Sequence, residues 1–400
     1  MSTVLVVTVD LGGNVPPVIG LAAELARRGH RVVVHADAAV RERAEAAGCA
    51  FRVAEGAAYD PLQPRGTVRT LREITRLFGD RGRGRSAVAA ARAVDADVVL
   101  VDVLLIGAAA EVEAAGLPTI LLGHTTWEYL RRSFGGGPIA ALLRLRGSAP
   151  LPVLAAADRL LVLTDRRLDP AEPLPDNARR VGPVLQDAPV GPHPTDPPTV
   201  LVSLSSIWYP GMQEALQRVL DGLADLPVHL EVTTGRTIDP RSLRVPPGAT
   251  VRGYADHAPL LASASAVVGH GGHATVVRAL AHGVPVLVLP MHPMLDQPLI
   301  GEALAASGAG LTLPKTASPA AIRAAVSRLL REPAFGGTAR AIAAGFAADD
   351  GAGRAADEVA AVAAGGLRVA RQGSGAADQV RSVRLQASSD SSSEDESSSK

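Results

Sequence analysis

The sequence has few aromatic residues, two lysines and a single cysteine. Phe, Trp and Tyr make up 3% of its 400 residues, whereas hydrophobic residues make up 47%, so aliphatic side chains and alanine must form most of any core. With Cys49 alone, an intramolecular disulfide and a cysteine-built metal site are both excluded. Forty basic residues balance forty acidic ones, which disfavours a nucleic-acid binder that depends on a broad basic surface.

Long apolar runs are also missing. No uninterrupted apolar segment is long enough to span a bilayer. The first ten residues, MSTVLVVTVD, lack the basic leader of a secretory peptide and predict a buried strand instead. We therefore expect a cytoplasmic protein that does not insert stably into a membrane.

The apolar pattern predicts two α/β domains with parallel sheets. A strand over residues 4–9, a glycine-containing turn, a helix near residues 18–25 and a strand over residues 31–35 make a βαβ unit. The alternation returns at residues 98–122 and again at residues 200–289. We assign residues 1–182 and 199–370 to two Rossmann-like domains, residues 183–198 to a Pro-rich linker, and the Ser-rich, acidic residues 371–400 to a disordered tail.

The most informative segment runs from Val267 to Gly310. A predicted strand ends in HGGHAT at residues 270–275, where a helix begins. A helix N-terminus offers unpaired N–H groups and partial positive charge to a diphosphate, and glycines allow close approach of the backbone. The next strand ends before Asp296 and Gln297, whose carboxylate and carboxamide suit neighbouring sugar hydroxyls. Both groups follow the carboxyl ends of parallel strands, where open α/β sheets bind ligands.

HGGHAT, GVPVLVLP and DQ in this order resemble the nucleotide-sugar signature of the GT-B family 1 glycosyltransferases, in particular actinobacterial enzymes that modify natural products. The resemblance implies two Rossmann-like domains that face each other across a cleft. It also implies transfer of a sugar, with inversion, from a UDP- or dTDP-sugar to a small-molecule acceptor. No cofactor beyond this co-substrate and no metal is expected.

The resemblance also assigns donor-binding roles. Tyr254 would stack on the nucleobase, with backbone contacts from Ala255. The diphosphate would lie against the turn at residues 270–275 and the loop SLSS at residues 203–206. Asp296 with Gln297 would hold the sugar. The full donor set is Ser205, Ser206, Tyr254, Ala255, His270, Gly271, Gly272, His273, Ala274, Thr275, Asp296 and Gln297.

The N-terminal domain departs from the family pattern at its first turn. The family carries Gly-His there, with the histidine as the base, whereas this chain has Gly13-Asn14. Asparagine is not a base at neutral pH. We expect Gly13 and Asn14 to contact the acceptor, with Asn14 orienting its hydroxyl.

Three residues could replace the missing base: Asp10 first, then His124, then Asp102. Each also has a structural alternative. Asp10 could be a turn acceptor, His124 a wall of the acceptor pocket and Asp102 a buried hydrogen-bond partner. The sequence does not decide between these roles.

Three other patterns are set aside. Asp95-Ala96-Asp97 has the DxD form of some metal-binding transferases but precedes a strand at its amino end, which predicts a cap. LGGNVPP lacks the GxGxxG spacing of a dinucleotide site. The basic run at residues 81–85, RGRGR, is interpreted as a flexible surface loop and a candidate acceptor-site flap.

Two alternative functions remain at this point. Asn14 motivates a catalytically silent partner that binds a nucleotide-sugar or product, and a GT-B-fold sugar-nucleotide epimerase would turn over donor without an acceptor. The sequence leaves open the acceptor, the sugar, the nucleotide, the linkage and the oligomeric state, with a homodimer as one option.

Overall fold

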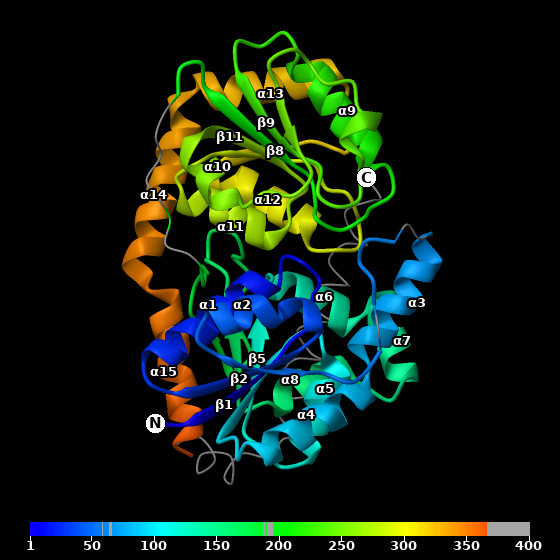
Figure 1. Cartoon of the computed structure of the whole chain (residues 1–400), viewed down its shortest axis with the longest axis vertical. Helices are drawn as coiled ribbons and strands as arrows, with labels where there is room; N and C mark the ends of the chain where they lie inside the picture. The colour runs from blue at the N-terminus through cyan, green and yellow to red at the C-terminus, as the bar shows by residue number, and fades with distance from the viewer. Residues whose placement is uncertain (58, 64–65, 187–188, 190–194, 366–400) are drawn as a thin grey trace, which may run out of the picture.

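A computed structural model describes residues 1–57, 59–63, 66–186, 189 and 195–365 of the chain. These residues form two α/β domains stacked one above the other (Figure 1). Each sheet is entirely parallel, as the continuous aliphatic runs predicted. The predicted tail, residues 371–400, and part of the predicted linker lie outside the described residues.

The N-terminal sheet has seven strands in the order β3-β2-β1-β4-β5-β6-β7. The first six follow the Rossmann order, in which β1 and β4 lie side by side at the point where the winding reverses. The carboxyl ends of β1, β4, β5 and β6 therefore form one edge. The strands are β1 (Thr3–Val7), β2 (Arg31–Ala36), β3 (Ala50–Val53), β4 (Val98–Asp102), β5 (Thr119–Gly123), β6 (Arg159–Val162) and β7 (Ala178–Arg180).

Helices cover both faces of this sheet, and each face has its own buried cluster. One cluster joins Val4, Val6 and Leu100 to α1, and the other joins Leu5, Val7 and Val99 to α4 and α5. The alternate residues of each strand thus point to opposite cores. The helices are α1 (Val15–Arg27), α2 (Arg41–Ala46), α3 (Thr67–Phe78), α4 (Arg81–Ala93), α5 (Ile106–Ala114), α6 (Trp127–Gly135), α7 (Gly137–Leu145) and α8 (Pro150–Ala156), with a 3₁₀ turn over Ala38–Val40.

The C-terminal sheet has six strands in the order β10-β9-β8-β11-β12-β13. They are β8 (Thr199–Ser203), β9 (His229–Thr233), β10 (Thr250–Arg252), β11 (Ala264–Gly269), β12 (Val286–Val288) and β13 (Gly310–Thr312). Two buried clusters again lie on the two faces. The helices are α9 (Met212–Leu223), α10 (His257–Ser263), α11 (His273–Ala281), α12 (Gln297–Ser307), α13 (Pro319–Arg331) and α14 (Pro333–Asp349), with a 3₁₀ turn over Pro240–Ser242.

The last helix, α15 (Gly351–Ala363), returns to the N-terminal domain (Figure 1). Its Ala355, Val359 and Val362 are buried in the same cluster as β1 and α1. Arg159, itself buried, reaches Glu358 of this helix at 2.8 Å. Residues 351–363 therefore complete the N-terminal core, although the sequence pattern had assigned them to the C-terminal domain of residues 199–370.

The interpretation of RGRGR as a flexible loop is wrong, because these residues form the first turns of α4. Asp80 caps the helix by accepting from the N–H groups of Gly82 and Arg83. Arg83 is 1% exposed and pairs with Asp37 at 2.8 Å. Gly84 lies so close to α5 that a Cβ there would approach the Glu111 side chain to 2.7 Å. The glycine thus serves close helix packing rather than flexibility.

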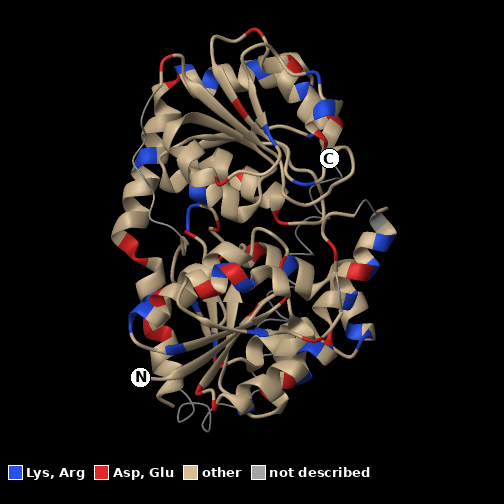
Figure 2. Cartoon of the chain, viewed as in Figure 1, with Lys and Arg blue, Asp and Glu red and all other residues tan. Residues whose placement is uncertain are grey.

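Acidic and basic residues are interspersed over both domains in the view of Figure 2. No single helix in the described part of the chain is long and apolar enough to cross a membrane. The helices α7 and α8, bent by 81°, meet that length and composition only when taken together.

Candidate active site

The carboxyl edges of the two sheets face each other and touch through side chains. The Thr125 hydroxyl donates to Asp296 Oδ2 at 2.6 Å, and Thr164 Oγ1 lies 2.8 Å from His273 Nε2. Gly13, in the first turn of the N-terminal domain, lies against Ala274 at the start of α11. Part of the predicted donor set, Asp296, His273 and Ala274, thus contacts the N-terminal domain at this interface.

Asp102 is at the centre of the N-terminal half of the site. It ends β4, is 0% exposed and accepts hydrogen bonds from three side chains. His124 Nε2 lies 2.9 Å from Oδ1, while Asn14 Nδ2 and Thr8 Oγ1 donate to Oδ2 at 2.7 and 3.1 Å. The Leu104 N–H donates to Oδ1 at 3.0 Å. A buried carboxylate with this many donors is stable in its ionised form.

The Asp102–His124 pair has electrostatics suited to proton transfer. Burial would raise the pKa of Asp102, but the charge and hydrogen bond of His124, together with Asn14, lower it overall. Burial likewise would lower the pKa of His124, but the Asp102 carboxylate outweighs this and raises it above the usual value of 6.5. The aspartate therefore stays deprotonated while the imidazole takes up the proton. This is the arrangement of a base oriented by a carboxylate.

Asn14, which was predicted to orient an acceptor hydroxyl, makes hydrogen bonds within the protein. Its Nδ2 group donates to Asp102 and, at 2.7 Å, to the carbonyl of Val9, while its Oδ1 accepts from the Leu11 N–H at 3.0 Å. Both N–H bonds of the carboxamide therefore have partners, and the side chain is 4% exposed. Asn14 thus helps to fix Asp102, and its contact with an acceptor stays a prediction.

Asp10 lies apart from this network. Its carboxylate accepts from the Gly12 N–H at 3.0 Å and lies 3.5 Å from the Arg43 guanidinium. These contacts match the alternative role as a turn acceptor. The structure therefore places His124, rather than Asp10, beside Asp102.

The predicted diphosphate turn has the geometry that the glycines implied. Gly272 precedes the first residue of α11, and Gly271 has φ +85°. A Cβ on Gly271 would approach Val288 to 2.6 Å, so only glycine fits there. The His270 imidazole lies directly against the α-carbon of Gly272. Burial, with a smaller effect of His257, lowers the pKa of His270 to about 4, which keeps the ring neutral at pH 7.

Two residues of the predicted donor set make contacts inside the protein. His273 contacts Thr164 across the interface, and burial, followed by the charge of His124, lowers its pKa to about 3. Gln297 is 1% exposed, and its Oε1 accepts from the N–H groups of Met291 and His292 at 2.7 and 3.1 Å. Gln297 therefore holds the loop before α12.

Asp296 immediately precedes α12 and lies among groups from both domains. Besides Thr125, it is close enough to His124 and to the buried phenols of Tyr129 and Tyr209 to shift their pKa values. Burial raises the pKa of Asp296, partly offset by the Thr125 hydrogen bond and the His124 charge. The carboxylate thus lies beside the proposed base.

The other predicted donor residues lie in loops, except Thr275, which lies in the first turn of α11. Ser205 Oγ accepts from the Ile207 N–H at 3.0 Å, and a Cβ on Gly12 would approach Ser206 Oγ to 2.7 Å. Tyr254 follows β10, is 67% exposed and has the Arg236 guanidinium 5.4 Å from its ring centroid. Ala255 and Thr275 are partly buried.

Sequence reasoning missed three residues of this interface, Thr125, Thr164 and Tyr209. Thr125 directly follows His124 and Thr164 follows β6 by two positions, so hydroxyls at strand ends were the available signal. Tyr209 is buried, with its ring centroid 6.1 Å from that of His270 and 6.3 Å from that of His292. Nothing in the local pattern marks it.

The DxD segment lies at the other edge of the N-terminal sheet. Asp97 Oδ2 accepts from the Thr3 N–H at 2.7 Å, at the amino end of β1, and Asp95 has φ +50°. The segment is a cap, as predicted.

Comparisons with known proteins bear on the fold and on the class of protein. Residues 217–362 match the model of the "Erythromycin biosynthesis protein CIII-like, C-terminal domain" family. A PGL/p-HBAD biosynthesis glycosyltransferase of Mycobacterium tuberculosis strain ATCC 25177 / H37Ra is 37% identical over 190 residues, 46% of this chain and 42% of that protein. The matched segment thus spans less than half of this relative.

Two solved structures match over almost the whole chain. The calicheamicin glycosyltransferase CalG4 has a TM-score of 0.71 and 25% identity and covers 90% of this chain and 98% of its own. The kitacinnamycin glycosyltransferase has a TM-score of 0.75 and 24% identity, with coverages of 90% and 99%. The chain therefore has the GT-B fold of these glycosyltransferases.

Proposed function

We propose that the chain is a nucleotide-sugar-dependent glycosyltransferase that transfers a sugar, with inversion, to a small, natural-product-like acceptor. The observation that carries the proposal is one interface at which a carboxylate-oriented imidazole faces a glycine-rich helix N-terminus. The Asp102–His124 pair supplies a base, and the start of α11 supplies an anion site. The names of the similar proteins support the same reaction class.

His124 is proposed as the base. Its Nε2 is bonded to Asp102, so Nδ1 is the nitrogen that takes the acceptor proton. The acceptor oxygen then attacks the anomeric carbon from the face opposite the nucleotide. The new oxygen–carbon bond forms as the bond to the diphosphate oxygen breaks, the proton moves to His124, and the negative charge leaves on the diphosphate. Attack from the opposite face inverts the anomeric configuration.

The C-terminal domain is proposed to stabilise the leaving diphosphate. The first N–H groups of α11 follow the glycine turn and would attract the diphosphate, and the neutral His270 ring adds a polar group at the turn without introducing a charge. A UDP- or dTDP-sugar is the proposed donor. Transfer from an activated sugar is redox-neutral, so we propose that no further cofactor is consumed.

Ligand-dependent thermal unfolding with UDP, dTDP, GDP and NAD tests the donor site. A ligand at a hundred times its dissociation constant stabilises by about 2.7 kcal/mol, which gives a shift of a few degrees. We expect UDP or dTDP to raise Tm, and mass spectrometry with the matching sugar and a panel of phenols and macrolides to detect a glycosylated product. Stabilisation by NAD alone would overturn the proposal.

The product assay also separates the two alternative functions. A silent binding partner would be stabilised by the nucleotide but would give no product with any acceptor, whereas an epimerase would convert the donor without an acceptor. The anomeric proton coupling in the product's NMR spectrum then reports inversion or retention.

A further inference from the structure

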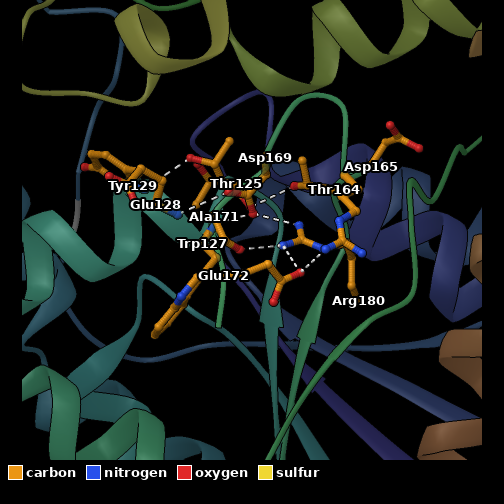
Figure 3. A network of polar contacts seen from close by, with 12 residues as sticks. Thr125, Trp127, Glu128, Tyr129, Thr164, Asp165, Asp169, Ala171, Glu172 and Arg180 are labelled. Carbon is orange, nitrogen blue, oxygen red and sulfur yellow. Dashed lines mark hydrogen bonds and ion pairs between the residues drawn. The ribbon is translucent and has the colours of Figure 1, made fainter. Parts of the chain in front are cut away.

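Two threonine hydroxyls join the domains at neighbouring positions. Thr125 and Thr164 follow the adjacent strands β5 and β6, and their partners Asp296 and His273 stand at the first turns of α12 and α11. Figure 3 shows both threonines in one polar network. The two contacts differ in chemistry, because Thr125 binds an acid and Thr164 binds a neutral imidazole.

The segment that carries Thr125 is held from both sides. At one end, its neighbour His124 is bonded to Asp102. At the other end, the Asp169 carboxylate accepts from the Trp127 N–H at 2.7 Å and is itself paired with Arg180 at 2.8 Å (Figure 3). The Thr125 carbonyl also accepts from Thr164 Oγ1 at 2.8 Å. The N-terminal domain thus presents the Thr125 hydroxyl in a fixed position.

This hydroxyl meets the carboxylate that the proposed function assigns to the donor sugar. Thr125 bonds Asp296 Oδ2, which leaves Oδ1 to accept from a sugar hydroxyl. A hydroxyl bonded to one oxygen restricts rotation of the carboxylate and so sets the direction of the other. Because Thr125 and His124 are consecutive, the same segment places both the base and the partner of Asp296.

We propose that Thr125 is a positioning residue that couples recognition of the donor sugar to placement of the base. The inference rests on the proposed function. Asp296 reaches its sugar-binding orientation only when the domains are closed, and in that closed state His124 also faces the anomeric carbon. A donor bound without this contact would be held by its nucleotide alone, with the sugar misaligned and open to water.

Substitutions at Thr125 and Thr164 test this coupling. Thr125→Val removes the hydroxyl at nearly constant volume, Thr125→Ser keeps it, and Thr164→Val is the matched control that breaks the neighbouring contact. Titration calorimetry measures binding of UDP and UDP-glucose, and of dTDP and dTDP-glucose, and the assay records the ratio of donor hydrolysis to transfer. Circular dichroism and Tm establish that each variant is folded.

Thr125→Val is expected to lose about tenfold in affinity for the nucleotide-sugar but little for the nucleotide, and to raise the ratio of hydrolysis to transfer. Thr125→Ser is expected to keep the wild-type affinity for the nucleotide-sugar and the wild-type ratio of hydrolysis to transfer. Thr164→Val is expected to change the affinities for nucleotide and nucleotide-sugar equally.

An equal loss of affinity for nucleotide and nucleotide-sugar in Thr125→Val would overturn the inference and leave Thr125 as an interdomain contact only. Failure of the proposed function has a different signature, because the unsubstituted protein would then transfer no sugar, whether or not it binds the nucleotide. A wild-type enzyme that transfers sugar but does not respond to Thr125→Val refutes the coupling alone.

Discussion

The two halves of the site consist of different kinds of chemical group. In the C-terminal domain the proposed anion site consists of backbone N–H groups, glycines and neutral imidazoles within one short segment, residues 270–275. In the N-terminal domain the proposed base depends on a buried carboxylate at the end of β4, whose side-chain partners follow β1, lie in the first turn and follow β5. Binding a diphosphate requires local backbone geometry, whereas moving a proton requires a network assembled from distant positions.

The same difference appears in the titrating groups. Burial lowers the pKa of His270 to about 4 and of His273 to about 3, because neither ring has a carboxylate partner to offset the loss of solvent. His124 is also buried, yet Asp102 raises its pKa. Of these three histidines, His124 is therefore the one expected to change charge near neutral pH.

Loss of the base should give the largest effect. His124→Asn is expected to lower kcat by about 10²–10⁴, because general-base catalysis contributes that much, while nucleotide affinity stays unchanged. Steady-state kinetics and calorimetry with UDP or dTDP check both parts. Asp10→Asn serves as the comparison and should keep most of the rate. A larger loss in Asp10→Asn than in His124→Asn would reverse our assignment.

Loss of a donor-side group should give a smaller but different effect. His270→Ala is expected to lower kcat/KM by about 10²–10³, the range found when a preorganised polar group near a developing charge is removed. Because the ring is neutral, the pH dependence should keep its wild-type shape. Kinetics from pH 5 to 9 measure this, and a shifted acid limb in His270→Ala would show that the wrong histidine was assigned.

The pH dependence of kcat/KM tests whether His124 is the titrating base. The base is active when neutral, so kcat/KM should be full above the pKa of His124 and should fall as pH drops through it, at a value above 6.5. Asp102→Asn removes the carboxylate that raises this pKa, so the acid limb should move to lower pH as the maximal rate falls. An acid limb that stays in place would exclude His124 as the titrating base.

The smallest effect is expected at the nucleobase. Tyr254 is largely exposed, so its stacking contributes about 0.5–1.5 kcal/mol. Tyr254→Ala should raise the donor KM about threefold to tenfold without changing kcat, and Tyr254→Phe should behave as wild type. A fall in kcat in Tyr254→Ala would show that the ring acts on more than binding.

Much of the fold could be predicted because parallel strands are buried on both faces. Runs such as residues 98–101 and 200–202 are aliphatic without alternation. The glycine turn before α11 could also be placed from the sequence, since its residues are contiguous. The missed features, Thr125, Thr164 and the role of Asn14, depend on contacts between residues 88–171 positions apart.

Two expectations from the sequence involve contacts that the local pattern does not show. RGRGR suggested flexibility because glycine is a poor helix former, but close packing of α4 on α5 and the buried pair of Arg83 with Asp37 stabilise a helix there. Asn14 suggested an acceptor contact because it occupies the position of the family histidine. The local sequence does not reveal that the side-chain amide of Asn14 donates a hydrogen bond to Asp102.

Because α15 packs in the N-terminal core, it affects when that core can fold during synthesis and how the domains can be exchanged between related enzymes. On the ribosome, the N-terminal core must wait for residues 351–363, the last part of the described chain to be synthesised, before Val359 can fill its place beside β1. An exchange of domains between related enzymes at residue 183 would therefore pair a foreign helix with the native N-terminal core. A chimera intended to keep that core intact should carry two crossover points, one in the linker and one at Asp350, where the chain turns with φ +42° between α14 and α15.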